Sequence, residues 1–255
     1  MTLTLDIGNS DVVFGLYDNA NWLHIWRTPS SPIQPADFYQ RKLRLWLLEA
    51  DLTLSQITQA TVSSVVPALT ANVCDAVGSL FALDPLVVSP SVYALLPVTV
   101  LCPQEIGIDL VANAVAAHTR YKQTCVVVDF GTALTFTTVG GDGRILGVAI
   151  APGLKTAIRS LFSSTAQLPE VPIKMPASAL GQNTVHAIQV GVVMGYEGLV
   201  RTMIARIRAE LGGTCLAVAT GGLSKAIPSL HNEFVAVVPS LTLDGIRLIG
   251  DCARR

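Results

Sequence analysis

The stretch LTLDIGNSDVVFGLYDN, residues 3–19, contains two apolar runs separated by Asp6-Ile7-Gly8-Asn9-Ser10. The same pattern returns about 120 residues later in TCVVVDFGTALTFTTVGGDGRILG, where an apolar run ends on Asp129-Phe130-Gly131-Thr132 and a second, β-branched run follows. Both copies close on turn residues, at 18–19 and at 140–143. A unit of strand, DxG turn, strand and turn therefore occurs twice, which predicts two similar α/β domains.

The segments around the two copies indicate how these domains are completed. Helical patterns cover residues 36–50, 108–122 and 183–211, and buried-strand patterns cover 59–66 and 215–220, the latter ending in the glycine turn of ATGGLS. We predict an N-terminal domain over residues 1–117 and a C-terminal domain over residues 118–255. The duplicated hairpins are expected to face each other across a nucleotide cleft.

Composition excludes several classes of protein. With 51% hydrophobic and 14% charged residues, the 255-residue chain can bury a large core, and its net charge of −1 gives no electrostatic footprint for nucleic acid. The five cysteines form no CxxC pair, which fits a reducing compartment. Without a secretory signal or an apolar run long enough for a bilayer, we expect a cytoplasmic protein with no membrane partner.

The DxG turns carry residue types that suit phosphate binding. Gly8 and Gly131 allow close approach of the backbone to a ligand, and amide or hydroxyl groups at Asn9, Ser10 and Thr132 can donate to phosphate oxygens. The carboxylates of Asp6 and Asp129, each at the end of an apolar strand, can be paired by a cation. A single DxGN is most often an ordinary turn, but two copies followed by ATGGLS favour a phosphoryl-transfer site.

The order of these motifs resembles that of the sugar-kinase, Hsp70 and actin superfamily, which implies two actin-like (RNase H-like) domains. A narrower resemblance rests on PQEIGIDLVANAVAA, VVDFGTALTF, GVAIAPGL, LGQNTVHAIQVGVVMGYEGLV, ATGGLS and LTLDGIRLIG. These blocks are similar to those of type III pantothenate kinases, in family order. That family phosphorylates pantothenate with ATP to 4'-phosphopantothenate, the first step of coenzyme A biosynthesis, as a homodimer that uses Mg²⁺ and a monovalent cation, K⁺ or NH₄⁺.

The resemblance also implies roles for individual residues. Asp109 would be the general base, Asp129 would hold the monovalent cation, and Thr184 would contact pantothenate in the site of the partner subunit of the dimer. The residues implied to contact ATP are Asp6, Ile7, Gly8, Asn9, Ser10, Asp11, Val12, Val13 and Thr132. The residues implied to contact pantothenate are Gly107, Ile108, Asp109, Leu110 and Thr184.

The chemistry of the reaction requires a residue such as Asp109. A primary hydroxyl is a poor nucleophile until a positioned carboxylate accepts its proton, an effect worth roughly 10²–10⁴-fold in rate. Asp109 also precedes the apolar pattern LVANAVAA, where an acid is a plausible helix cap. Spacing alone leaves catalysis and capping open, and the resemblance favours catalysis.

Two positions depart from the family pattern on the side of the acceptor substrate. Leu110 stands where the family has arginine, and Val100 stands where it often has tyrosine. Loss of a charge-assisted partner weakens binding by roughly 1.5–3 kcal/mol. Besides an active pantothenate kinase, two alternatives therefore stay open: a diverged, non-catalytic binding or accessory protein, and a kinase for another small hydroxy acid.

Overall fold

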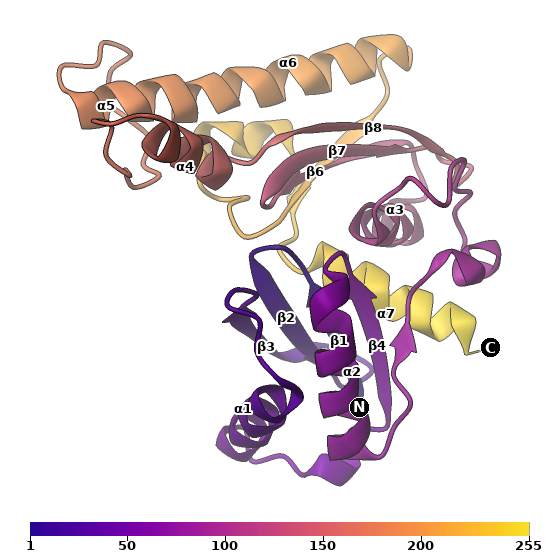
Figure 1. Ribbon diagram of the computed structural model, residues 1–255. Coiled ribbons are helices and arrows are strands. Elements are labelled where there is room, and N and C mark those ends of the chain that lie inside the picture. Colours follow the sequence, from indigo (N-terminus) through magenta and orange to yellow (C-terminus); the bar gives the residue numbers. More distant parts are fainter. Residues whose placement is uncertain (255) are drawn as a thin grey trace. The chain divides into compact units, whose positions relative to one another are not determined.

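The computed structural model describes residues 1–254 and divides the chain into two compact units (Figure 1). Unit 1 combines Met1–Ala116 with the C-terminal segment that starts at Thr242, and unit 2 is Ala117–Leu241. The first division falls within α3 (Ile108–Tyr121), and the second falls after Leu241, the first residue of α7 (Leu241–Ala253). The domain ranges predicted from the sequence, 1–117 and 118–255, stay a prediction. In the structure the segment that starts at Thr242 belongs to unit 1, which is therefore discontinuous in sequence.

Unit 1 is built on a mixed five-stranded sheet of order β3-β2-β1-β4-β5. The antiparallel strands β1, β2 and β3 form the predicted hairpin and its extension, whereas β4 and β5 run parallel to β1. Apart from Asp6 every residue of β1 is buried, as is typical of a strand covered on both faces. The strands are β1 (Thr2–Ile7), β2 (Asp11–Tyr17), β3 (Trp22–Pro29), β4 (Gln59–Ser64) and β5 (Leu86–Val87).

The helices of unit 1 bury apolar side chains against this sheet. Leu3, Leu5 and Ile7 of β1 share one hydrophobic cluster with residues of the first two helices, including Tyr39, Leu43 and Val73. The C-terminal helix buries Leu243, Ile246 and Ile249, which recur at the spacing of one helix face. The helical elements are α1 (Ala36–Glu49), η1 (Leu54–Gln56), α2 (Pro67–Phe81), η2 (Pro90–Leu95), α3 and α7 (Leu241–Ala253).

Unit 2 repeats the sheet of unit 1. Its order is β10-β9-β6-β7-β8, with β6, β7 and β8 antiparallel and with β9 and β10 parallel to β6. Each strand corresponds to the one five places earlier in the chain, so the duplicated sequence motif has folded into a duplicated topology. The strands are β6 (Cys125–Phe130), β7 (Ala133–Val139), β8 (Ile145–Pro152), β9 (Leu216–Thr220) and β10 (Ala236–Val237).

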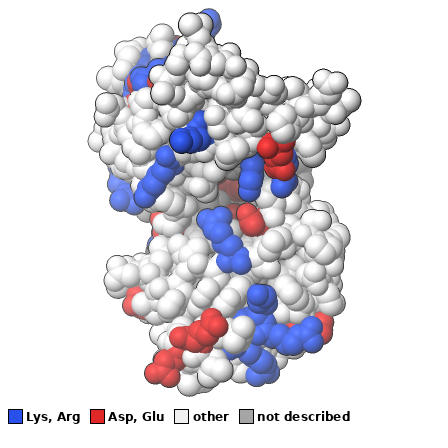
Figure 2. All heavy atoms as spheres, turned by 90° about the vertical axis from the view of Figure 1, so that its left-hand side faces the viewer, with Lys and Arg blue, Asp and Glu red and all other residues white. Residues whose placement is uncertain are grey.

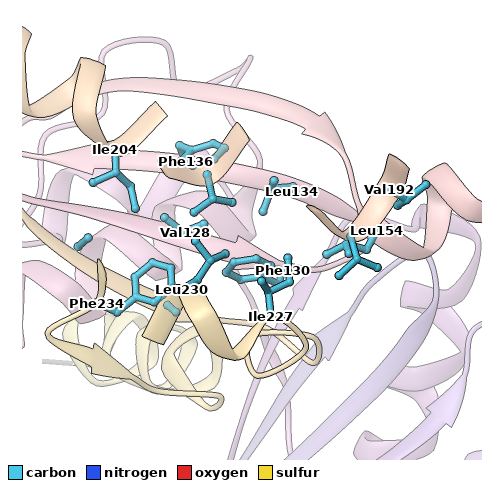
Figure 3. Packing of buried hydrophobic residues seen from close by; sticks show 14 of the residues in the cluster. Val128, Phe130, Leu134, Phe136, Leu154, Val192, Ile204, Ile227, Leu230 and Phe234 are labelled. Atoms are coloured by element: carbon cyan, nitrogen blue, oxygen red, sulfur yellow. The ribbon is translucent and has the colours of Figure 1, made fainter. Parts of the chain in front are cut away.

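One face of this second sheet carries the hydrophobic core of unit 2. Phe130 packs edge to face with Phe234, and Val128, Leu134 and Phe136 lie beside them in the same cluster (Figure 3). Each such aromatic or aliphatic side chain contributes roughly 1.5–3 kcal/mol when fully buried. The helical elements of unit 2 are α4 (Leu154–Ser164), α5 (Thr184–Gln189), a π-helical turn η3 (Val190–Met194), α6 (Gly195–Glu210) and η4 (Pro228–Glu233).

Charged side chains of both signs occur on the face of the molecule shown in Figure 2. On the face shown in Figure 2, acidic and basic side chains are interspersed and uncharged residues cover most of the area. This distribution agrees with the net charge of −1. Among the described residues, no helix combines the length and the hydropathy that crossing a membrane requires.

Candidate functional site

The first DxG turn joins β1 to β2 and is held by backbone hydrogen bonds. The Gly8 N–H donates to the Asp11 carbonyl at 3.0 Å, and the Ser30 hydroxyl donates to the Gly8 carbonyl at 2.6 Å. Asn9 and Ser10 are exposed at the tip of the turn. Their amide and hydroxyl groups are therefore presented to solvent on a fixed backbone, where they can contact phosphate oxygens.

The residues on either side of the turn tip, within the predicted ATP-binding segment 6–13, are less exposed than Asn9 and Ser10. Ile7, Val12 and Val13 are buried, whereas Asp6 and Asp11 are partly buried. Because the three apolar side chains belong to the interior of unit 1, only their backbone groups are available to a ligand. They position the turn through packing.

The second DxG turn joins β6 to β7 with the same internal bond. The Gly131 N–H donates to the Ala133 carbonyl at 3.1 Å, and the exposed Thr132 is fixed through its own carbonyl. That carbonyl accepts hydrogen bonds from the Gly153 N–H at 3.0 Å and from the Thr156 hydroxyl at 2.7 Å. Residues at the start of α4 thus fix the backbone of Thr132. The Thr132 residue itself is exposed on the surface of unit 2.

Asp129 lies at the end of β6, partly buried, on the sheet face opposite the hydrophobic cluster. Gly221 follows β9 with a φ angle of +90°, and a Cβ atom at this position would collide with the Oδ1 atom of Asp129. Gly221 of the ATGGLS turn is therefore required for two reasons. Its backbone has a left-handed conformation that favours glycine, and any side chain at this position would collide with the Asp129 carboxylate. This arrangement links the second and third sequence motifs physically.

Asp109 lies in the first turn of α3, and its Oδ1 atom accepts a hydrogen bond from the N–H of Leu110 at 3.0 Å. Burial raises the pKa of its carboxyl group, an effect that the hydrogen bond from Leu110 partly opposes. A raised pKa makes an aspartate a stronger base than it is in water. A Cβ atom at Gly107 would collide with the carboxylate, so the glycine two residues earlier makes room for it.

The geometry at Asp109 bears on its two predicted roles, as a general base and as a helix cap. An N-cap side chain binds an N–H two or three residues further on, whereas Asp109 binds the N–H of its immediate neighbour. The N–H groups of Leu110 and Val111 also donate to the carbonyl of Gly107. The carboxylate is therefore not needed to satisfy the first turn, although its negative charge is favourable at a helix N-terminus.

The remaining predicted substrate residues divide between interior and surface. Leu110 is 5% exposed and belongs to the interior of unit 1, and Ile108 and Val100 are partly buried. Tyr93 on η2 was not singled out from the sequence. Its side chain is buried, and this burial raises the pKa of its phenol. The nearby negative charge of Asp109 raises that pKa further.

Thr184 is the first residue of α5 and lies in unit 2. The preceding Asn183 caps the helix, since its side-chain oxygen accepts a hydrogen bond from the N–H of His186 at 2.9 Å. The region borders a hollow of about 710 Å³. Its lining joins polar groups of residues 181–184 to the apolar side chains of Leu161, Leu168, Ile188 and Val192.

The predicted residues are thus distributed over both units. Asp6, the first turn and residues 107–110 belong to unit 1, and Asp129, Thr132 and Thr184 belong to unit 2. Among the described residues, no group of three or more histidine, cysteine, aspartate or glutamate side chains forms a metal cluster.

The duplicated sheets and their DxG turns define the class predicted from the sequence, an α/β protein with two actin-like units. A solved structure of a Baf family protein from Campylobacter jejuni has the same fold, with a TM-score of 0.59 and 18% identity over 97% of this chain and 96% of that one. The activator of 2-hydroxyisocaproyl-CoA dehydratase from Clostridium difficile, solved with bound ADPNP, matches with a TM-score of 0.52 and 13% identity, covering 99% and 96%. The predicted fold class is confirmed.

The family follows from sequence comparison. The family model for type III pantothenate kinase matches residues 2–206. A type III pantothenate kinase from Treponema pallidum is 46% identical over 250 residues, which cover 96% of this chain and 91% of the relative. The chain belongs to the type III pantothenate kinase family, which makes it a phosphotransferase and confirms the resemblance seen in the motifs.

Proposed function

We propose that this protein transfers the γ-phosphoryl group of ATP to the primary hydroxyl of pantothenate, forming 4'-phosphopantothenate at the start of coenzyme A biosynthesis. The observation that carries the proposal is the carboxylate of Asp109. It is partly buried at the start of α3, this burial raises its pKa, and Gly107 leaves the room that it occupies. Family membership supplies the identity of the acceptor.

In the proposed reaction the Asp109 carboxylate accepts the proton of the pantothenate hydroxyl. The hydroxyl oxygen forms a bond to the γ-phosphorus while the bond between that phosphorus and the β,γ-bridging oxygen breaks, and ADP leaves. Asn9 and Ser10 on the first turn and Thr132 on the second donate hydrogen bonds to phosphate oxygens. Because both turns are held by backbone hydrogen bonds, these donors need little reorganisation.

We assign the cations to the two strand-terminal aspartates. Mg²⁺ is usually held by one or two carboxylates together with substrate phosphates, and Asp6 supplies such a group. When bound, the metal neutralises developing negative charge on the phosphates. We assign a monovalent cation to Asp129, where the single carboxylate at the end of β6 matches a single positive charge.

We further propose that the protein acts as a homodimer in which Thr184 contacts pantothenate bound to the partner subunit. The edge strand β8 supports association, since Leu146, Val148 and Ile150 are 40%, 38% and 69% exposed along it. An exposed apolar edge strand is ordinarily covered by a partner. Light scattering after size-exclusion chromatography measures the oligomeric state, and a monomer would contradict this part of the proposal.

The second candidate is a kinase for another small hydroxy acid, and the observation that favours it is Leu110. This side chain is buried where the family has arginine, so the acceptor site lacks a cationic partner at that position. Leu110 is equally compatible with a diverged, non-catalytic accessory protein. Unlike the accessory protein, either kinase requires the Asp109 carboxylate.

The deciding experiment measures ADP release with ATP and pantothenate, together with mass spectrometry of the product. We expect 4'-phosphopantothenate to form, and Asp109→Asn to abolish most of the turnover. A panel of small hydroxy acids follows if pantothenate is inert. Turnover of another acid would establish the second candidate, and absence of any acceptor-dependent turnover would leave the accessory protein. Complementation of a strain without pantothenate kinase tests the same function in cells.

A further inference from the structure

The two DxG turns are bordered by equivalent strand ends. In unit 1, β3 ends at Pro29, which is paired with Asp11, the first residue of β2. In unit 2, β8 ends at Pro152, which is paired with Ala133, the first residue of β7. The residue that follows each proline therefore occupies an equivalent place beside its DxG turn.

Both of these residues donate a backbone hydrogen bond to the turn. The Ser30 N–H donates to the Ser10 carbonyl at 3.0 Å, and the Gly153 N–H donates to the Thr132 carbonyl at 3.0 Å. Ser10 and Thr132 each directly precede the strand that follows the turn. The duplicated topology thus includes the bond that holds each turn against the end of β3 or β8.

A side-chain hydroxyl adds a second bond to each turn, but from a different position in the two units. In unit 1 the Ser30 hydroxyl donates to the Gly8 carbonyl at 2.6 Å. The equivalent Gly153 has no side chain, and a Cβ atom there would collide with the backbone of the turn. In unit 2 the hydroxyl comes instead from Thr156 on the first turn of α4, which donates to the Thr132 carbonyl at 2.7 Å. The two units therefore hold their turns by the same chemistry through unrelated residues.

These hydroxyl bonds fix the orientation of peptide groups at the tips of the turns. In a trans peptide the carbonyl and the next N–H lie in one plane and point in opposite directions. A hydroxyl that holds the carbonyls of Gly8 and Thr132 therefore also sets the direction of the N–H groups of Asn9 and Ala133. Donors that are oriented before a phosphate arrives bind it without the cost of reorganisation.

We propose that Ser30 and Thr156 are positioning residues for ATP, whose hydroxyls hold the two DxG turns in the conformation that binds the triphosphate. This inference rests on the proposed function and extends it to two residues outside the DxG motifs. Ser30 is 5% exposed, whereas Thr156 is exposed on α4. Because an exposed side chain contributes little to the core, Thr156 separates an effect on the turn from an effect on stability.

The test measures binding of a non-hydrolysable ATP analogue to the full-length protein by calorimetry, together with the Michaelis constants for ATP and pantothenate. Thr156→Val removes the hydroxyl with little change of shape, Thr156→Ser keeps it, and Ser30→Ala removes the hydroxyl in unit 1. Ser160→Ala is the matched control, because the Ser160 hydroxyl donates to the Ala157 carbonyl at 2.8 Å on the same helix and does not contact the turn.

Thr156→Val and Ser30→Ala should each weaken binding of the analogue, and raise the Michaelis constant for ATP, about three- to tenfold, the range for one lost hydrogen bond. The Michaelis constant for pantothenate should stay the same. Thr156→Ser should recover most of the affinity that Thr156→Val loses, and Ser160→Ala should bind as wild type does. The unfolding temperature of Thr156→Val should lie within about 2 °C of that of wild type.

The proposal is overturned if either Ser30→Ala or Thr156→Val binds the analogue with wild-type affinity. It is also overturned if Thr156→Ser binds as weakly as Thr156→Val, because the hydroxyl would then not be responsible. An equal loss in Ser160→Ala, or a weakening of both substrates together with a lower unfolding temperature, would show a general structural effect instead.

The calorimetric measurement contains no acceptor, so it is independent of the identity of the phosphorylated substrate. Turnover of pantothenate with unchanged affinity for the analogue in both variants would overturn the positioning role and leave the kinase function intact. Weaker binding in Ser30→Ala and Thr156→Val, in a protein that does not phosphorylate pantothenate, would support the positioning role and contradict the function.

Discussion

The indole N–H of Trp22 on β3 donates a hydrogen bond to the Asp244 carboxylate on α7 at 2.7 Å, and this contact joins residues 222 positions apart. Two further contacts hold the same helix. The Thr242 hydroxyl donates to the side-chain oxygen of Asn113 at 2.9 Å, and the Arg247 guanidinium lies 4.4 Å from the centre of the Tyr17 ring. These contacts explain why the last helix belongs to unit 1.

We expect Trp22→Phe to lower the free energy of unfolding by about 1–3 kcal/mol, because the aromatic ring is kept while a hydrogen bond to a charged group is lost. Urea denaturation of Trp22→Phe, Asp244→Asn and the double variant gives the coupling between the two side chains. Additive effects of the two substitutions would show that this hydrogen bond does not hold α7.

Asp109→Asn should reduce turnover at least about 100-fold, the lower range for loss of a general base. Binding of ATP should change little, because Asp109 contacts the acceptor hydroxyl in the proposed reaction. Steady-state kinetics and calorimetry with a non-hydrolysable ATP analogue measure the two quantities separately. Turnover near that of wild type would remove Asp109 from the catalytic role.

The same substitution should stabilise the fold at neutral pH. Burial raises the pKa of Asp109 above its ordinary value of 3.8, so the folded state binds this proton more tightly than the unfolded state. This carboxyl group therefore lowers stability as the pH rises from the unfolded pKa through the folded pKa. Unfolding temperatures of wild type and Asp109→Asn should differ little at about pH 4 and favour the variant at about pH 7. An equal difference at both pH values would contradict the pKa shift.

Leu110→Arg tests whether the family arginine can simply be restored. Because Leu110 is 5% exposed, the new guanidinium would enter the interior of unit 1 without a designated partner. We expect a loss of about 3–5 kcal/mol in stability and no fall in the Michaelis constant for pantothenate. Leu110→Met is the control and should cost less than about 1.5 kcal/mol. A stable arginine variant with a lower Michaelis constant would show that the pocket has kept room for the original contact.

Local patterns predicted most of the elements that carry the motifs. The helix expected over residues 36–50 is α1, that over 108–122 is α3, and that over 183–211 comprises α5, η3 and α6. The strand expected over 59–66 is β4. These segments have strong periodicity or bounding turn residues, so their form follows from short-range sequence.

Contacts between residues that are far apart in the sequence could not be predicted from these local patterns. The motif LTLDGIRLIG gives no sign that α7 packs with the strands near the N-terminus, because that choice depends on Trp22, Tyr17 and Asn113. Ser30 and Thr156 lie outside the DxG motifs and look like ordinary polar residues. Their hydrogen bonds to the two turns become visible only when the ends of β3 and β8 are placed beside those turns. Likewise, the burial of Leu110 depends on packing around α3.

The return of α7 to unit 1 has a consequence for how the chain is made. During synthesis, all of unit 2 except Leu241 is translated before α7, so unit 1 still lacks a helix of its core at that stage. Because Leu243, Ile246 and Ile249 are buried in the finished protein, the incomplete unit 1 would expose the apolar surface that they cover. Unit 1, which contains the first residues to be translated, is therefore completed only after unit 2 has been translated.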